Sequence, residues 1–364
     1  MKLTVTKNEI KNKLALIQNI VEKSGSQPIL SHFLLTATAG KATITATDLT
    51  ISIREPLEAT IEAEGIMCIP ARKLLEIVRE SDADIILEAV DPQWVSIKSG
   101  KSKFKLACLP HGEFPLWPEV GVGSSLIFKG ADLSQIIEKT LFCAGQDDTR
   151  YTLNGLLFDI IPESKTLAVV GTDGHRLAVS TKDIDYSGQL RKLILPRKAA
   201  SELLRLLSDE AEIIITLAEN NMGFRIGEIE FLARLIEGTY PNYEQVLPKG
   251  NDKHLTVDTA LLTRAIRKTS LMSKEGNNTV VFNVEAKTLT VSSAVAELGE
   301  ATDVIEVEYS AEPIKLGFNS GYLMDAVSAF KGEKLTLSIL GQVAPVLLTN
   351  EDPHYRSIVM PIRL

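Results

Sequence analysis

Hydrophobic and polar positions follow two different periods along this chain, and the changes between them mark out helices and strands. Apolar residues recur at helical spacing in segments 7–23, 131–144 and 258–272. Apolar residues alternate with polar ones, or run through β-branched types, in segments 41–65, 166–184 and 288–310. We therefore expect an α+β protein in which helices lie on one side of antiparallel sheets.

The order of these elements repeats three times. Residues 69–90, IPARKLLEIVRESDADIILEAV, match residues 195–218, LPRKAASELLRLLSDEAEIIITLA, since both combine a proline, two basic residues, an amphipathic helix and a strand. Residues 317–340 form a third version, in which Asn319 or Ser320 takes the capping position. The long period indicates three similar domains with two helices each, at 1–120, 125–248 and 253–364.

Two shorter segments repeat where neighbouring domains are expected to join. Residues 111–120, HGEFPLWPEV, match residues 237–248, EGTYPNYEQVLP, in a core of glycine, an aromatic residue and proline. Because proline and glycine are frequent in connecting segments, we expect both segments to be linkers between domains.

Charge is divided unevenly between the helices and the rest of the chain. The 364 residues have a net charge of −8, which by itself argues against a nucleic-acid partner. The six predicted helices nevertheless hold fifteen basic and nine acidic residues, a net +6 that leaves −14 for the remainder. If the helices share one surface, that surface attracts a polyanion. Duplex DNA, held through its phosphates without base reading, is the expected partner.

Motifs for catalysis and for cofactors are missing from the sequence. It has no GxxxxGK[ST], GxGxxG, HExxH or GxSxG motif, and its five histidines lack metal-ligand spacing. We expect no enzymatic activity, no cofactor and no metal. Cys68, Cys108 and Cys143 form no disulfide framework, and no signal peptide or membrane-spanning run occurs. We therefore expect a cytoplasmic protein.

The stretch GTDGHRLAVS (171–180) is the strongest candidate for catalysis, because Asp173 and His175 lie two residues apart. A metal-dependent hydrolase that uses this pair is one hypothesis. The favoured interpretation is a β-hairpin, since Asp-Gly is a hairpin signal. The first repeat has the same Thr-Asp pair at Thr47 and Asp48 but no histidine after it, which indicates that the acid is a turn residue. A generic protein scaffold with a basic face is the third hypothesis.

Nine short motifs occur in a fixed order along the whole chain: VTKNEI (5–10), TATDL (45–49), PARKLLEI (70–77), RYTLNGLLF (150–158), TDGHRLA (172–178), LPRKA (195–199), YPNYEQVLP (240–248), LGFNSGYLMDAV (316–327) and VMPIRL (359–364). Together they resemble the bacterial DNA sliding clamps, the β subunits of DNA polymerase III. The resemblance implies a head-to-tail homodimer, a ring of six domains whose helices line a channel around duplex DNA. It also implies a non-catalytic processivity factor for DNA replication and repair.

Three sets of functional residues follow from this resemblance. A partner-peptide pocket for the polymerase, the clamp loader and repair proteins would use Leu153, Thr172, Gly174, His175, Arg176, Leu177, Pro241, Val246, Tyr322, Val343, Pro345, Val359, Met360, Pro361 and Ile362. DNA contacts would come from Arg72, Lys73, Gln146, Arg150, Tyr151, Arg197, Lys198, Arg205, Arg264, Arg267 and Lys268. The dimer seam would join Phe104 and Leu106 of one protomer to Leu271 and Met272 of its partner.

Three positions depart from the residues that are usual in the sliding clamps. Gln245 stands where a basic residue is common, so the pocket wall is expected to be less cationic. Thr152 replaces a frequent second aromatic residue at a DNA contact. Ile362 replaces a methionine and should keep that surface apolar.

Overall fold

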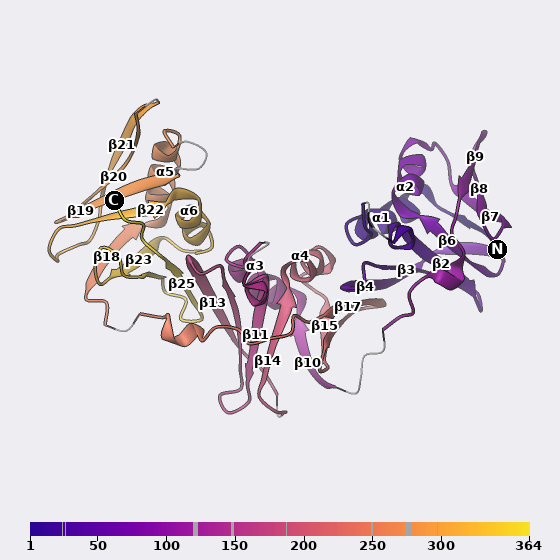
Figure 1. Ribbon diagram of the computed structural model, residues 1–364, viewed down its shortest axis with the longest axis horizontal. Helices are drawn as coiled ribbons and strands as arrows, with labels where there is room; N and C mark the ends of the chain where they lie inside the picture. The colour runs from indigo at the N-terminus through magenta and orange to yellow at the C-terminus, as the bar shows by residue number, and fades with distance from the viewer. Residues whose placement is uncertain are drawn as a thin grey trace. The chain divides into compact units, whose positions relative to one another are not determined.

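The computed structural model describes the chain except residues 24, 26, 119–122, 147–148, 187, 249, 274–277 and 297 (Figure 1). The predicted end of the first domain, residue 120, lies outside the described residues. By its internal contacts the chain divides into two compact units, unit 1 (Met1–Ser134 with Lys198–Leu235) and unit 2 (Gln135–Arg197 with Ile236–Leu364). This division passes through the second repeat, because each half of that repeat joins a sheet with a neighbouring repeat.

Six α-helices occur among the described residues, two in each repeat: α1 (Lys7–Ile17), α2 (Ala71–Glu80), α3 (Gly130–Leu141), α4 (Arg197–Leu206), α5 (Thr259–Ser270) and α6 (Ser320–Ser328). Asp258 and Asn319 cap α5 and α6, since each side chain accepts a hydrogen bond from the backbone N–H three residues on. The predicted helix 7–23 is too long: α1 ends at Ile17, and the buried Ile20 continues the apolar pattern in a turn.

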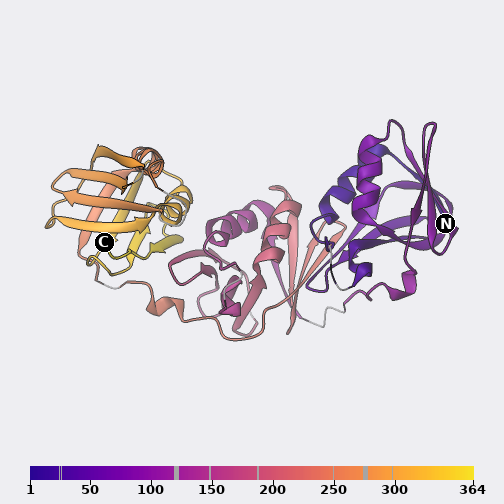
Figure 2. The same cartoon turned by 45° about the horizontal axis from the view of Figure 1, so that its top comes forward.

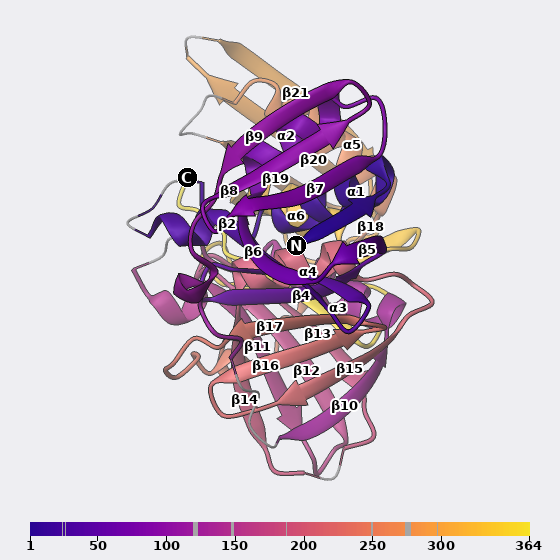
Figure 3. The ribbon, with the colours of Figure 1, turned by 90° about the vertical axis from the view of Figure 1, so that its right-hand side faces the viewer.

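Unit 1 contains two antiparallel sheets. The five-stranded sheet has the order β5-β1-β7-β8-β9, formed by β1 (Lys2–Val5), β5 (Ala59–Ala63), β7 (Ile85–Asp91), β8 (Trp94–Ser99) and β9 (Ser102–Ala107). The eight-stranded sheet has the order β10-β15-β16-β17-β4-β3-β2-β6, formed by β2 (His32–Thr38), β3 (Lys41–Thr47), β4 (Ile51–Leu57), β6 (Gly65–Pro70), β10 (Ser124–Lys129), β15 (Glu212–Leu217), β16 (Asn221–Ile226) and β17 (Ile229–Arg234). Figure 3 shows β4, β17, β16, β15 and β10 side by side.

Unit 2 also contains two antiparallel sheets. Its eight-stranded sheet has the order β14-β11-β12-β13-β25-β24-β23-β18, formed by β11 (Gly155–Ile161), β12 (Thr166–Thr172), β13 (Arg176–Asp183), β14 (Arg191–Pro196), β18 (Lys253–Asp258), β23 (Lys334–Ile339), β24 (Val346–Thr349) and β25 (Tyr355–Val359). Its four-stranded sheet has the order β21-β20-β19-β22, formed by β19 (Thr279–Glu285), β20 (Thr288–Val295), β21 (Gly299–Glu306) and β22 (Ile314–Asn319).

Among the described residues every repeat has the same order of α-helices and strands, namely a strand, a helix, four strands, a helix and three strands, with β5 as an additional strand in the first repeat. Strands of the second repeat pair with strands of its neighbours. Strand β17 pairs with β4, with Leu232 opposite Ser52, and β25 pairs with β13, with Ile358 opposite Leu177. Each eight-stranded sheet therefore unites strands of two repeats. The predicted α+β class and the threefold repeat are confirmed.

The helices bury one face each against the sheets of their own repeat. Leu74, Leu75 and Val78 of α2 are buried, and Figure 2 shows the two N-terminal helices on one side of the N-terminal strands. Among the described residues no helix is both long and apolar enough to span a membrane. The same residues include no cluster of His, Cys, Asp and Glu that could hold a metal ion.

Candidate functional site

The predicted hairpin of GTDGHRLAVS is present between β12 and β13. One carboxylate oxygen of Asp173 accepts hydrogen bonds from the backbone N–H groups of His175 at 2.9 Å and Arg176 at 3.0 Å. The hydroxyl of Thr172 donates to the carbonyl of Arg176 and accepts from the N–H of Gly174. Gly174 has a φ of +84°, a left-handed conformation that glycine adopts without strain. The turn is therefore closed by its own residues.

The first repeat contains the same turn without glycine or histidine. Asp48 accepts from the N–H groups of Thr50 and Ile51, and the hydroxyl of Thr47 donates to the carbonyl of Ile51. Leu49 takes the place of Gly174 with a φ of +71°, and its side chain is half exposed. Because the acid makes the same bonds in both repeats, it is a turn residue.

The hypothesis that Asp173 and His175 form a catalytic pair is not supported by this geometry. The second carboxylate oxygen of Asp173 accepts from Nε of Arg176 at 3.0 Å. The His175 ring stacks on Tyr322 of α6, with 6.2 Å between the ring centroids. The Asp173 carboxylate thus binds backbone N–H groups of the turn and the Arg176 guanidinium, and the His175 imidazole packs on the Tyr322 ring.

Arg176 connects the turn to α6. Its Nη1 lies 2.6 Å from a carboxylate oxygen of Asp325, and its guanidinium lies 4.3 Å from the ring centroid of Tyr322. Burial opposes the charge of Arg176, but Asp325 and Asp173 outweigh that effect and raise its pKa. The predicted pocket residues Arg176, His175 and Tyr322 therefore form one stacked and ion-paired group.

The C-terminal strand β25 supplies the apolar floor beside this group. Ile358 lies opposite Leu177 and belongs to one buried cluster with Leu153, Leu177 and Tyr240. Val359 is fully buried in a different core cluster, on the other face of the sheet. Since successive side chains of a strand point to opposite faces, Val359 lies on the same face as its partner Arg176, whereas Ile358 lies on the face of Leu177. Val359 stays a predicted pocket residue, and Ile358 is an additional candidate that period-two alternation along β25 could have indicated.

The remaining predicted pocket residues lie at the ends of the same elements. The Met360 N–H donates to the carbonyl of His175 at 2.9 Å, and the Ile362 N–H donates to that of Gly317 at 2.8 Å, which places Pro361 between two anchored residues. Val343 is exposed, and Pro345 is half-buried just before β24, whose Val346 lies opposite Val359.

The linker segment supplies the other side of this surface. Pro241 and Val246 are exposed, and they flank Tyr243, whose ring is buried in the cluster with Leu177. A cavity of about 400 Å3 adjoins the cluster and is lined by Tyr243, Val179 and Leu247 among others. The structure thus brings together on unit 2 the turn, α6, the linker and the C-terminal residues, which we call the His175 surface.

The predicted DNA contacts fall into exposed and internally bonded groups. The exposed members are Lys73, Gln146, Arg150, Tyr151, Lys198, Arg205, Arg264, Arg267 and Lys268. Arg72 and Arg197 are half-buried instead, and they donate to the backbone carbonyls of Gln18 and Leu141. Burial lowers the pKa of Arg197. These two guanidiniums therefore hold helix ends together as well as adding positive charge.

Arg150 has a position that the sequence did not indicate. Its Nη2 donates to the carbonyl of Asp173 at 2.8 Å, so the side chain lies against the hairpin of the His175 surface. Lys198 forms an ion pair with Asp48, and Lys268 pairs with Asp303 at 3.0 Å. Within their observed bounds the six helices keep thirteen basic and seven acidic residues, a net charge of +6.

The predicted seam residues lie on exposed parts of the two units. Phe104 and Leu106 are on β9, the last strand of the five-stranded sheet, and the Phe104 side chain is 39% exposed. Leu271 follows α5 and is 75% exposed, and Met272 next to it is half-buried. Large apolar side chains at such exposure are typical of a surface that is covered in an assembly.

The structure is therefore that of a threefold-repeated protein with basic helices and exposed apolar side chains. The chain belongs to the family of DNA polymerase III beta subunits. Its family models match the N-terminal domain at residues 1–118, the central domain at 128–242 and the C-terminal domain at 244–363. This family consists of sliding clamps, which are non-catalytic processivity factors.

Curated relatives and solved structures agree with this assignment over the full length. The beta sliding clamps of Caulobacter vibrioides and Escherichia coli K12 are 32% and 31% identical, with all of each chain covered. The crystal structure of the DNA polymerase III subunit beta from Pseudomonas aeruginosa is 32% identical, with a TM-score of 0.92 and complete coverage of both chains. A sliding clamp from Bartonella birtlesii bound to griselimycin is also 32% identical, with a TM-score of 0.94 and complete coverage of both chains.

Replacement of Gly174 by alanine tests how the turn holds Arg150. A Cβ at this position would lie 2.6 Å from Nη1 of Arg150, whereas a Cβ on Gly40, which has a similar φ of +72°, would meet nothing within 4 Å. We expect Gly40→Ala to lower the free energy of unfolding by about 1–2 kcal/mol, because of the left-handed backbone alone. Gly174→Ala should cost about 1 kcal/mol more through loss of the Arg150 hydrogen bond. Denaturant titration measures both.

An Arg150→Ala background provides the control for this comparison. There the two glycine substitutions should cost the same, because the hydrogen bond is already absent. A surplus cost of Gly174→Ala that persists without Arg150 would contradict the assignment of Arg150 to the turn.

Proposed function

We propose that two copies of this chain close head to tail into a ring around duplex DNA and tether the replicative polymerase and other replication and repair proteins to it. The observation that carries this conclusion is the pairing of strands between repeats. The last strand of a repeat pairs with the fourth strand of the preceding one at both internal junctions, as β17·β4 and β25·β13.

One further last strand and one further fourth strand each lack a partner strand on one side in the described part of the chain. They are β9, the last strand of the first repeat, and β21, the fourth strand of the third repeat. Unpaired strand edges invite pairing with another chain. Pairing β9 of one protomer with β21 of its partner repeats the internal junctions and satisfies both edges. Applied twice, a head-to-tail contact of this kind closes a ring of six repeats.

The register of the internal junctions specifies which residues would meet at this seam. In the β13·β25 pair Leu177 and Ile358 face each other. The residue that corresponds to Leu177 in the third repeat is Glu300 on β21, and the residue that corresponds to Ile358 in the first repeat is Lys105 on β9. An opposite-charge pair directly across two antiparallel strands is stabilising. Phe104 lies next to Lys105, and its exposed ring would be covered at the same seam.

The ring explains how an acidic protein holds DNA. The basic helix residues, among them Arg264, Arg267 and Lys268 of α5, attract phosphates, while the remaining acidic surface repels them. Closure around the duplex retains the DNA topologically, so individual contacts can stay weak enough to permit sliding.

The His175 surface is the proposed docking site for short linear motifs of the partners. Its support is the combination of an apolar floor of Leu177 and Ile358 with polar groups from His175 and Arg176 at the rim. The three domains are proposed to lie at 1–120, 125–248 and 253–364. A cytoplasmic location is proposed because Cys68, Cys108 and Cys143 are all unpaired and buried.

Retention on DNA circles tests the topological mechanism. Protein loaded on a nicked circular duplex should remain bound through gel filtration, and cutting the circle once should release it, because an open end lets the ring slide off. Raised salt should remove little of the protein from the closed circle. Equal retention on linear and circular DNA would contradict encirclement.

A charge exchange tests the seam. Lys105→Glu places two acids opposite each other at both symmetric seams, so we expect the dissociation constant of the dimer to rise roughly tenfold. Adding Glu300→Lys should restore the dimer. Analytical ultracentrifugation measures both, and Lys41→Glu, at the exposed first residue of β3, is the matched control. A double variant as weak as Lys105→Glu alone would disprove this register.

Removal of residues 360–364 tests the His175 surface. This deletion takes away Met360, Pro361 and Ile362, so binding of purified polymerase III alpha subunit should be lost, while dimerisation and retention on DNA circles persist. Deletion of residues 363–364 alone is the control, and it should keep binding. Surface plasmon resonance with immobilised alpha subunit measures the difference, and full binding by the longer deletion would exclude this docking surface.

A further inference from the structure

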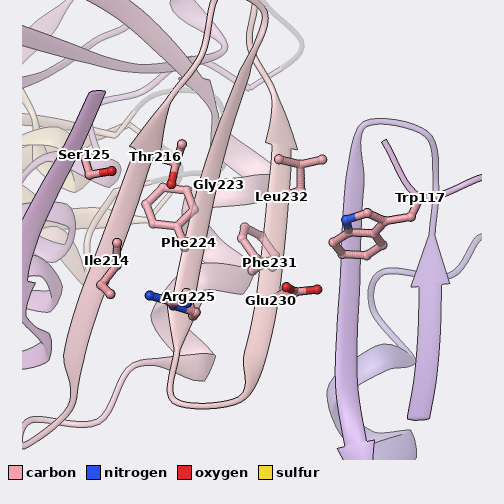
Figure 4. A pocket seen from close by; sticks show the side chains of 10 residues that line it. All are labelled: Trp117, Ser125, Ile214, Thr216, Gly223, Phe224, Arg225, Glu230, Phe231 and Leu232. Carbon is pink, nitrogen blue, oxygen red and sulfur yellow. The ribbon is translucent and has the colours of Figure 1, made fainter. Parts of the chain in front are cut away.

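A cavity of about 380 Å3 lies on the eight-stranded sheet of unit 1, and it contains none of the residues assigned above to DNA, partner or seam (Figure 4). Strands β10, β15, β16 and β17 contribute to it, and Trp117 stands beside them from the linker after the first repeat. This volume is within the range that binds small ligands and single side chains of peptides.

The floor of the cavity lies on a row of residues in which two positions carry very small side chains, Gly223 in the cavity lining and Ser52 at the end of the row. Thr216, Gly223, Leu232 and Ser52 lie directly opposite one another along one row across β15, β16, β17 and β4. Gly223 provides no side chain, and the hydroxyl of Ser52 is bound to that of Thr47 at 2.8 Å. Leu232 is thus the one large apolar side chain in this row.

The corresponding row of residues in unit 2 carries larger side chains. At the second internal junction the positions of Ser52, Leu232 and Gly223 are taken by Leu177, Ile358 and Leu347. There Tyr243, which corresponds to Trp117 in the repeated linker, packs among these three apolar side chains. Two leucines are replaced by serine and glycine in unit 1, so the first junction leaves open the space that the second one fills.

Charged groups at one end of the cavity are arranged asymmetrically. Arg54 pairs with Glu230 at 3.4 Å, and its guanidinium covers a face of Trp117, with 4.3 Å to the ring centroid. Arg225 also lines the cavity and is exposed. It lies directly opposite Glu230, whose carboxylate pairs with Arg54, and forms no ion pair of its own among the described residues. A guanidinium without an ion pair beside an apolar hollow selects an anionic group next to an apolar one.

We propose that this cavity binds a short extended peptide in which a large apolar side chain adjoins an acidic residue. The apolar side chain fills the space over Gly223, next to Leu232, and the carboxylate pairs with Arg225. The choice of a peptide rests on the proposed docking function of the related His175 surface. The hollow and its cation do not depend on that function.

Tryptophan fluorescence gives a reporter at the site itself. The chain has two tryptophans, and Trp94→Phe leaves Trp117 alone. The probe is acetyl-aspartyl-phenylalanine amide, and acetyl-asparaginyl-phenylalanine amide is its uncharged counterpart. We expect a saturable change of Trp117 emission, with the charged probe bound about tenfold more tightly because of a charged hydrogen bond. No saturable change with the charged probe would overturn the proposal.

Two variants decide which groups are responsible. Arg225→Gln should abolish the tenfold preference for the charged probe, while Arg79→Gln, at an exposed arginine outside the cavity, should leave it unchanged. Gly223→Leu, which copies Leu347, should abolish binding of both probes, and circular dichroism checks its fold. An undiminished preference in Arg225→Gln would overturn the proposal, even if Gly223→Leu does not fold.

Retention on DNA circles separates this proposal from the proposed function. Gly223→Leu and Arg225→Gln should stay on circles as the parent protein does. If the parent protein binds no probe but is retained on DNA circles, only the cavity proposal is overturned. Failure of the parent protein to distinguish circles from linear DNA would overturn the ring and leave a positive fluorescence result intact.

Discussion

Hydrogen-bonded pairing of strand edges between successive repeats is the constraint on which this structure depends. A sheet edge exposes a row of backbone donors and acceptors, and these are satisfied most directly by another strand. The second repeat meets this requirement on both sides, through β17·β4 and β13·β25. The same pairing brings the C-terminal strand next to the Asp173 hairpin. The His175 surface therefore exists because two sheets that are distant in sequence join into one.

The two internal junctions have the same backbone pairing but different side chains. Leu177 in one corresponds to Ser52 in the other, and Gly174 corresponds to Leu49. In the second junction apolar side chains and a glycine turn form the His175 surface, the proposed docking site. In the first, a row with smaller side chains borders a cavity that Trp117 also lines. The repeats thus share the same strand pairing, and different side chains give each junction a different surface.

Charge is separated by structural element rather than by domain. Most basic side chains of the helices are exposed, but Arg176, on a strand, is enclosed between Asp173, Asp325 and aromatic rings. Exposed cations act on a distant polyanion through their summed field, which salt weakens. An enclosed ion pair with matched hydrogen bonds acts locally, since it orients the side chains around it. Arginine thus occurs in this protein both on exposed helix faces and in an enclosed, ion-paired group.

The amino-acid pattern was sufficient to predict the main helices and strands, the threefold repeat, the hairpin at Asp173 and the basic character of the helices. Each of these depends on local propensity, on periodicity or on counting, all of which survive without a fold. It misjudged the end of α1, because buried residues continue an apolar period beyond the helix. The position of Ile358 opposite Leu177 and that of Arg150 against the hairpin became apparent only in the folded chain. The first depends on register between strands far apart in the chain, because a shift of one residue would reverse every side chain. The second depends on how a residue outside the strands approaches the hairpin.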